Sequence, residues 1–155
     1  AKKVMMTDIS DYRLELARSV GADQVVNTTK VDFNDALIDF FGSDKCDYYY
    51  DCAGSDITMN QAIRSARKGA KLVLVAVFNK LANVDLAVLN DHELDLDTTM
   101  MYRHEDYVDA IKWVHEGKIK LTPLISKHFA FRDYLSAYEY IDANRETTMK
   151  VLIDV

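Results

Sequence analysis

The side chains best suited to chemistry follow short apolar runs and do not form a compact catalytic motif. Asp8 comes directly after the run at residues 2–7, and Cys52 follows the β-rich stretch DYYYD at 47–51. A carboxylate can bind hydroxyl groups, whereas a thiol must lose its proton before it acts as a nucleophile or metal ligand. Because no histidine lies near Cys52 in the sequence, we expect this residue to be a small buried thiol.

Metal and acid–base chemistry finds little support in the remaining polar residues. The four histidines do not form the H-x-x-x-H or H-E-x-x-H spacing of a zinc site, and they lie at positions 92, 104, 115 and 128. Asp95 and Asp97 alternate along an expected strand, which is more typical of a solvated face than of an acid–base pair. We therefore expect no catalytic and no metal-binding residue in this chain.

Glycine is scarce, and its spacing excludes two phosphate-binding motifs. The five glycines are isolated from one another, at positions 21, 42, 54, 69 and 117. A P-loop and a G-x-G-x-x-G turn both need closely spaced glycines, because the backbone must approach the phosphates. This chain therefore contains no glycine-rich phosphate cradle.

Composition narrows the class of protein further. A length of 155 residues fits one domain, and a hydrophobic share of 49% fits a globular core. The net charge of −6 argues against a nucleic-acid partner, which would require a basic face. No apolar run approaches the ~18 residues of a membrane span. Two cysteines are too few for a disulfide scaffold, so we expect reduced thiols and a cytoplasmic location.

The sequence alternates between strand-like and helix-like segments. Ser10 suits the N-cap of the first helix, and Gly21 suits its left-handed end. The segment 84–90 is ambiguous, and 121–129 is expected to be an extended connection around Pro123. Strands are expected at 2–7, 23–27, 47–51, 71–78, 94–101 and 150–155, and helices at 11–20, 32–41, 56–67, 105–116 and 133–143.

This alternation predicts an α/β fold with a doubly wound, mostly parallel sheet and helices on both faces. In such folds ligands bind at the carboxyl ends of the strands. The residues that follow the expected strands are therefore the candidates for a site, namely Asp8, the stretch 51–54, Phe78 and the stretch 101–103.

These strand ends resemble medium-chain, zinc-dependent alcohol and polyol dehydrogenases such as sorbitol, xylitol and threonine dehydrogenases. The resemblance covers essentially the whole chain in order. It rests on VMMTDISDYRLELARSVGAD (4–23), YDCAG (50–54), RKGAKLVLVA (67–76), LDLDTTMMYR (94–103), IKLTPLISKHF (119–129) and FRDYLSAYEYI (131–141).

The resemblance implies a Rossmann-like fold that lacks its first β-strand, its glycine turn and its first helix. Residues 1–155 would then be a partial NAD-binding domain with the C-terminal tail of the dehydrogenase. The strands that end at Asp8 and Asp51 would flank the position of the missing strand. We expect this gap to be closed by direct pairing of those strands, by a strand from another chain, or by contacts in a dimer.

The resemblance also implies cofactor contacts at the strand ends. Asp8 would bind the adenosine ribose hydroxyls and repel a 2′-phosphate, which favours NAD over NADP. Arg13 would lie along the adenine, where a solvated surface arginine is the alternative. The remaining expected contacts line the nicotinamide side of the cleft or reach a phosphate, and they are Cys52, Ala53, Gly54, Ala76, Val77, Phe78, Met101 and Arg103.

By this resemblance the chain is part of an oxidoreductase that transfers a hydride between a polyol or secondary alcohol and NAD with the assistance of zinc. The zinc would be held by an N-terminal domain that is absent here, so we expect the isolated chain to be inactive. We also expect a homodimer or a higher homo-oligomer. The alternative is a non-enzymatic α/β regulatory module that binds an adenine nucleotide or a protein partner.

Overall fold

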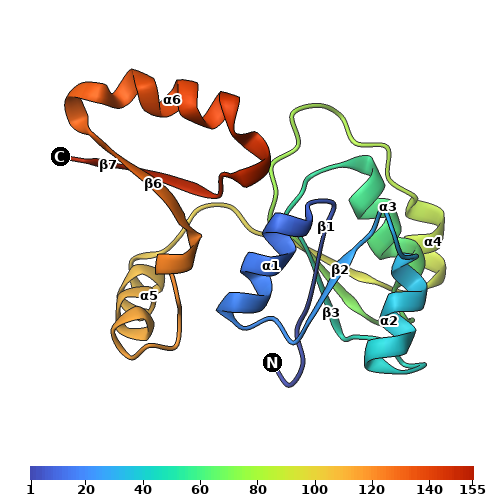
Figure 1. The fold of residues 1–155 in the computed structure, drawn as a ribbon. Coiled ribbons are helices and arrows are strands. Elements are labelled where there is room, and N and C mark those ends of the chain that lie inside the picture. The colour runs from blue at the N-terminus through green and yellow to red at the C-terminus, as the bar shows by residue number, and fades with distance from the viewer. The chain divides into compact units, whose positions relative to one another are not determined.

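The computed structural model describes residues 1–155, which divide into two compact units (Figure 1). The first unit contains residues 1–30 and 103–155, and the second contains residues 31–102. Both units consist of short parallel strands connected by helices. None of the helices combines the length and the apolar composition that a bilayer crossing requires.

The first unit begins with a βαβ motif. Strand β1 (Met5–Asp8) pairs in parallel with β2 (Gln24–Asn27), and α1 (Asp11–Val20) connects them. The Ser10 hydroxyl accepts a hydrogen bond from the Arg13 amide, which confirms the predicted N-cap. Gly21 ends the helix at φ 119°, a left-handed conformation that favours glycine. This part of the sequence-based prediction is therefore confirmed at both helix ends.

The rest of the first unit contains a second parallel pair. Strand β6 (Ile125–Ala130) pairs with β7 (Lys150–Asp154), and α6 (Tyr134–Ala143) lies between them in the sequence. The prediction of a plain extended connection at 121–129 missed β6. Pro123 lies in the short 3₁₀ turn η1 (Thr122–Leu124), so it does not interrupt the strand that follows. The other elements of this part are α5 (His104–His115), η2 (Phe131–Asp133) and η3 (Arg145–Thr147).

The second unit contains a three-stranded parallel sheet in the order β3–β4–β5. Its strands are β3 (Tyr48–Asp51), β4 (Lys71–Leu74) and β5 (Asp95–Thr98), and its helices are α2 (Phe33–Phe41), α3 (Asp56–Ser65) and α4 (Leu86–Asp91). The ambiguous segment 84–90 is thus largely helical.

Strand β4 is four residues shorter than predicted. The sequence-based expectation was a strand over 71–78, but the strand ends at Leu74. The amides of Val75 and Ala76 both donate to the Asp51 carbonyl oxygen, over 2.9 and 3.0 Å. Because both amides turn to one acceptor, the regular ladder stops there.

The core of the second unit lies between its sheet and its helices. Leu37 of α2, Ile63 of α3 and Leu72 of β4 are its most deeply buried large side chains. The opposite face of the sheet is open, because Tyr48 and Tyr50 are 58% and 65% exposed. The helices of this unit therefore cover one face of its sheet (Figure 1).

The strand order agrees with a doubly wound sheet whose first strand is missing. The classical order 3-2-1-4-5-6, without strand 1, leaves one pair and one triplet of strands. The chain forms a β1–β2 pair and a β3–β4–β5 triplet. Strands β1 and β3 belong to different sheets in different units, and how the expected gap between them is closed stays a prediction. One edge of β1 and one edge of β3 therefore have no strand partner.

Candidate cofactor-binding site

Asp8 forms a half-exposed acceptor at the carboxyl end of β1. Its Oδ1 atom accepts hydrogen bonds from the amides of Ile9 and Ser10, both over 2.8 Å. The Arg13 guanidinium lies 3.5 Å from the same oxygen. The Asp8 side chain is 31% exposed, and its hydrogen bonds leave Oδ2 without a partner. The carboxylate is thus held in one orientation with an acceptor available to a ligand.

Arg13 lies in the first turn of α1, as the sequence predicted. Its guanidinium faces Asp8 and is partly exposed. A pair of this kind in contact with water adds little stability. The two residues form a partly exposed ion pair at the start of α1.

The second unit places a tight turn after β3, at residues 52–54. The buried Asp51 carboxylate accepts through Oδ1 from the amides of Ala53 and Gly54, over 3.1 and 3.3 Å. Thr58 Oγ1 donates to the same oxygen over 3.1 Å. The Ser55 hydroxyl caps α3 by accepting from the Thr58 amide. The turn is therefore hydrogen-bonded to the buried Asp51 carboxylate and leads directly into the N-terminus of α3.

Gly54 brings this turn against the loop that follows β4. Its φ of 69° is left-handed, and a Cβ atom added to it would lie 2.9 Å from the Ala76 Cβ atom. The same atom would lie 3.3 Å from the Val77 carbonyl oxygen. The structure thus brings together Gly54, Ala76 and Val77, and only glycine fits at position 54.

Cys52 is exposed, so the expectation of a buried thiol is wrong. The sequence does not show that the turn after β3 points this residue outward. Displacement of water by nearby protein atoms, and secondarily the charge of Asp51, raise the pKa of the Cys52 thiol. A raised pKa keeps the thiol protonated at neutral pH, which does not favour a nucleophile or a metal ligand.

The other predicted site residues occupy loops. Ala76, Val77 and Phe78 lie beyond the end of β4, with Val77 exposed. Met101 lies beyond the end of β5, is exposed and has a left-handed φ of 65°. Arg103 belongs to the first unit, where its amide donates to Asp106 Oδ2 over 2.7 Å at the start of α5. Of the predicted site residues, the structure thus places Gly54 against Ala76 and Val77, and Asp8 beside Arg13.

Asp51 was among the strand-end candidates, but the sequence predicted no cofactor contact for it. The signal was its position at the end of a strand whose alternate residues point inward. Tyr49 and Asp51 are the two buried residues of β3. An acid on the buried face requires donors nearby, and only the folded turn shows which donors these are.

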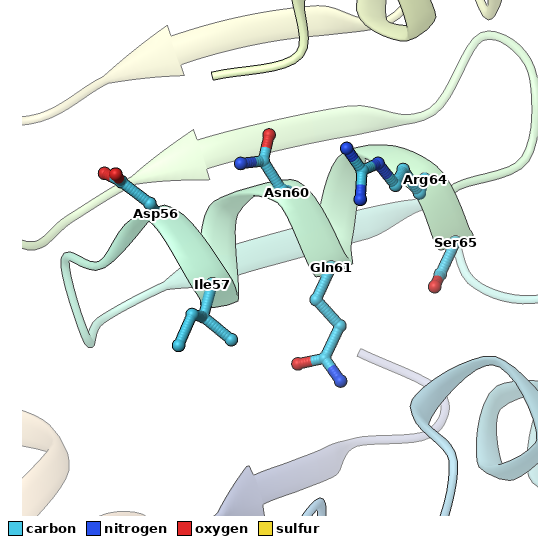
Figure 2. Close-up of a pocket in the computed structure, with 6 residues that line it drawn as sticks. All are labelled: Asp56, Ile57, Asn60, Gln61, Arg64 and Ser65. Atoms are coloured by element: carbon cyan, nitrogen blue, oxygen red, sulfur yellow. The ribbon is translucent and has the colours of Figure 1, made fainter. Parts of the chain in front are cut away.

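Two further features carry no part of this site. A shallow hollow of about 480 Å³ lies along α3, and all of its lining residues belong to this helix (Figure 2). Asp97, one of the two alternating acids of β5, pairs with Lys71 across the sheet at 3.0 Å. No three His, Cys, Asp or Glu side chains come together as a metal site.

Comparison with known proteins decides the family. A family model described as zinc-binding dehydrogenase matches residues 1–116, which is three quarters of the chain. The chain belongs to the zinc-binding dehydrogenase family. The match includes the β1–α1–β2 motif and the entire second unit, and thus all ten predicted cofactor contacts.

This family member is similar in sequence to polyol dehydrogenases. It is 28% identical to sorbitol dehydrogenase 1 of Saccharomyces cerevisiae, and the match covers 99% of the chain but 44% of that relative. The chain therefore spans less than half the length of the curated relatives that it matches. The predicted kinship with sorbitol dehydrogenases is confirmed.

Solved structures show the same fold. L-idonate 5-dehydrogenase of Escherichia coli matches 99% of the chain with a TM-score of 0.87 and 24% identity, and the match covers 43% of that protein. An alcohol dehydrogenase of Escherichia coli CFT073, solved with its cofactor NADH, matches 97% of the chain with a TM-score of 0.85 and 23% identity. That match covers 44% of the Escherichia coli CFT073 protein. The predicted α/β class of fold is thus confirmed.

Proposed function

We propose that this chain is the carboxyl-terminal, cofactor-binding part of an oxidoreductase that transfers a hydride between a polyol or secondary alcohol and NAD with the assistance of zinc. The observation that carries the proposal is the Asp8 carboxylate, oriented by two backbone amides at the carboxyl end of a parallel strand. The family membership and the similarity to sorbitol dehydrogenase support the reaction class.

Asp8 is suited to bind the adenosine ribose of the cofactor. Its Oδ2 atom is available to accept from a hydroxyl group, while Oδ1 stays bound to the amides of Ile9 and Ser10. A carboxylate in this position would repel the 2′-phosphate of NADP. Arg13 keeps the carboxylate in place and offers a planar face to the adenine.

In the second unit, the turn 52–54 and the loop 76–78 would form a wall along the nicotinamide half of the cofactor. The close approach of Gly54 to Ala76 gives this wall a backbone surface with small side chains. Backbone amides and carbonyls in such a surface can bind a carboxamide. Met101 and Arg103 complete the proposed set of cofactor contacts, Arg103 through a guanidinium suited to phosphate oxygens.

The residues of this chain do not fit a zinc ion, because no cluster of three ligating side chains is present. We therefore propose that the zinc ligands lie outside these 155 residues and that none of the reaction steps on zinc involves side chains of this chain. Bound NAD supplies the acceptor for the hydride. The role of this chain is to bind and orient the cofactor, and we expect no dehydrogenase activity from these residues alone.

The proposal also covers partners and location. The substrate would be a small polyol or secondary alcohol, bound mainly by residues outside this chain. The acidic net charge of −6 does not favour nucleic acid as a partner. We propose a cytoplasmic protein that forms a homodimer or higher homo-oligomer.

Calorimetric titration of the chain with NAD, NADP, AMP and ATP tests the cofactor proposal. We expect NAD to bind at least about tenfold more tightly than NADP, and Asp8→Asn to remove most of that preference. The Asn oxygen can still accept from the Ile9 and Ser10 amides, so the turn should persist. Asp39→Asn is the matched control, because Asp39 is an exposed acid of α2.

An unchanged NAD/NADP preference in Asp8→Asn would contradict the role of Asp8. Binding of AMP or ATP with no stronger binding of NAD would favour the regulatory-module alternative. Formation of NADH from an alcohol by the chain alone would contradict the proposal that the zinc and substrate sites lie outside it.

A further inference from the structure

The end of β3 contains a buried carboxylate that the proposed cofactor contacts do not include. Asp51 is 8% exposed, and its Oδ2 atom is buried without a hydrogen-bond partner. Burial of an unpaired carboxylate oxygen costs free energy, so packing alone does not favour an acid at this position. The other oxygen of the same group shows what the acid is used for.

Oδ1 of Asp51 binds three donors that define the turn after β3. Two are the amides of Ala53 and Gly54, at 3.1 and 3.3 Å. The third is Thr58 Oγ1 at 3.1 Å, from the first turn of α3. A charged acceptor forms stronger hydrogen bonds than a neutral one, so the turn is held firmly to both the strand and the helix.

The backbone of the same residue holds the neighbouring loop. The Asp51 carbonyl oxygen accepts from the amides of Val75 and Ala76, over 2.9 and 3.0 Å. Ala76 is also the residue that leaves no space for a Cβ atom at Gly54. The turn 52–54 and the loop after β4 therefore take their relative position from one residue.

We propose that Asp51 is a positioning residue, whose carboxylate fixes the turn 52–54 against Ala76 and so sets the shape of the wall along which the dinucleotide lies. The inference rests on the proposed cofactor function. Asp51 itself does not contact the cofactor, because its carboxylate is buried behind the turn. Its effect on binding passes through the backbone of Ala53 and Gly54.

The test compares four variants of the 155-residue chain by two measurements, NAD affinity from calorimetry and hydrogen exchange of the Ala53 and Gly54 amides. Asp51→Ala removes the acceptor, so we expect roughly tenfold faster exchange at both amides and about tenfold weaker NAD binding. Asp51→Glu keeps the charge but moves the acceptor by one methylene group, so it should show the same two changes to a smaller degree.

The other two variants separate the effect of Asp51 on the position of the turn 52–54 from its effect on the thermal stability of the chain. Asp51→Asn keeps an oxygen in place for the same donors but loses the charge, so exchange and NAD affinity should change less than in Asp51→Glu even if thermal stability falls. Thr58→Val removes one donor and leaves both backbone bonds, so it should change exchange at Ala53 and Gly54 less than Asp51→Glu does.

Unchanged exchange at Ala53 and Gly54 in a folded Asp51→Ala chain would overturn the proposal, as would faster exchange with unchanged NAD affinity. If Asp51→Ala does not fold, the contrast between the Glu and Asn variants decides, and equal behaviour of these two would overturn it. A wild-type chain that does not bind NAD contradicts the proposed function, while exchange still reports whether Asp51 holds the turn.

Discussion

Asp8 at the end of β1 and Asp51 at the end of β3 differ in burial, and we expect them to have different roles for that reason. Asp8 is half-exposed, is held by two local amides and retains a free oxygen. Asp51 is buried and uses one oxygen to hold a turn. An exposed carboxylate can exchange water for a ligand, whereas a buried one mainly organises its own surroundings. Gly54, like Asp51, acts within the protein itself, because its missing side chain lets the turn approach Ala76 closely.

Replacement of Gly54 by alanine should destabilise the chain more than the same change at Gly69. Both residues have a left-handed φ, of 69° and 71°, so both variants pay a backbone cost of about 1–2 kcal/mol. Only at Gly54 would the new Cβ atom meet another atom below 3.0 Å, which we expect to add about 1–3 kcal/mol.

Urea unfolding of the two glycine variants measures this difference. Because a Cβ atom at Gly69 would meet nothing within 4 Å, Gly69→Ala isolates the backbone cost. Equal free energies of unfolding for the two variants would show that Ala76 moves aside without cost.

At the scale of elements, helix α3 connects the candidate wall to the core of the second unit. Its N-terminus starts at the cap residue Ser55, next to the turn 52–54, and its inner face buries Met59 and Ile63. The outer face carries Ile57, which is 78% exposed and lines the hollow of Figure 2. The helix therefore anchors the turn 52–54, because its N-terminus follows the turn directly and its inner face packs in the core.

Truncation of Ile63 should lower the stability of the chain far more than truncation of Ile57 on the same helix. Ile63 is fully buried, so Ile63→Ala leaves a cavity and should cost about 2–5 kcal/mol in the free energy of unfolding. Ile57→Ala removes an exposed side chain and should change stability by less than about 0.5 kcal/mol. Thermal and urea unfolding of both variants check the expectation, and similar losses would place Ile57 in a packed interface.

At the scale of the whole molecule, unpaired strand edges and exposed apolar side chains are the main features. Strands β1 and β3 each keep an edge without a partner strand. Tyr48 and Tyr50 are exposed on one sheet face, and α5 has no buried residue. Both features favour association. An unpaired strand edge can form backbone hydrogen bonds with another chain, and exposed apolar side chains leave contact with water when they are covered.

We therefore expect the chain to self-associate in solution. Light scattering at micromolar concentration should give a mass above the 17.7 kDa of one chain. Added salt should not dissociate the assembly, since the contacts would be backbone hydrogen bonds and apolar groups rather than ion pairs. A stable mass of a single chain would contradict this expectation and would show that the open edges are tolerated.

The sequence alone determined the order of most strands and helices, the caps of α1 and the strand ends where a site was to be sought. These features depend on nearest neighbours: Ser10 and Gly21 act within one helix, and an alternation of short strands and helices leaves few topologies. The position and the charge of Asp8 followed from the same local pattern, and the family match agreed with the resemblance found there.

Tertiary structure decided the features that depend on residues far apart in the sequence. Strand β4 stops early because two of its following amides turn to Asp51, twenty-four or more residues before them. Cys52 points outward, and Asp51 inward, because the turn between β3 and α3 is fixed by hydrogen bonds and not by polarity alone. Hydrogen-bond partners and close approaches such as that of Gly54 to Ala76 arise only when distant segments meet, so no local pattern encodes them.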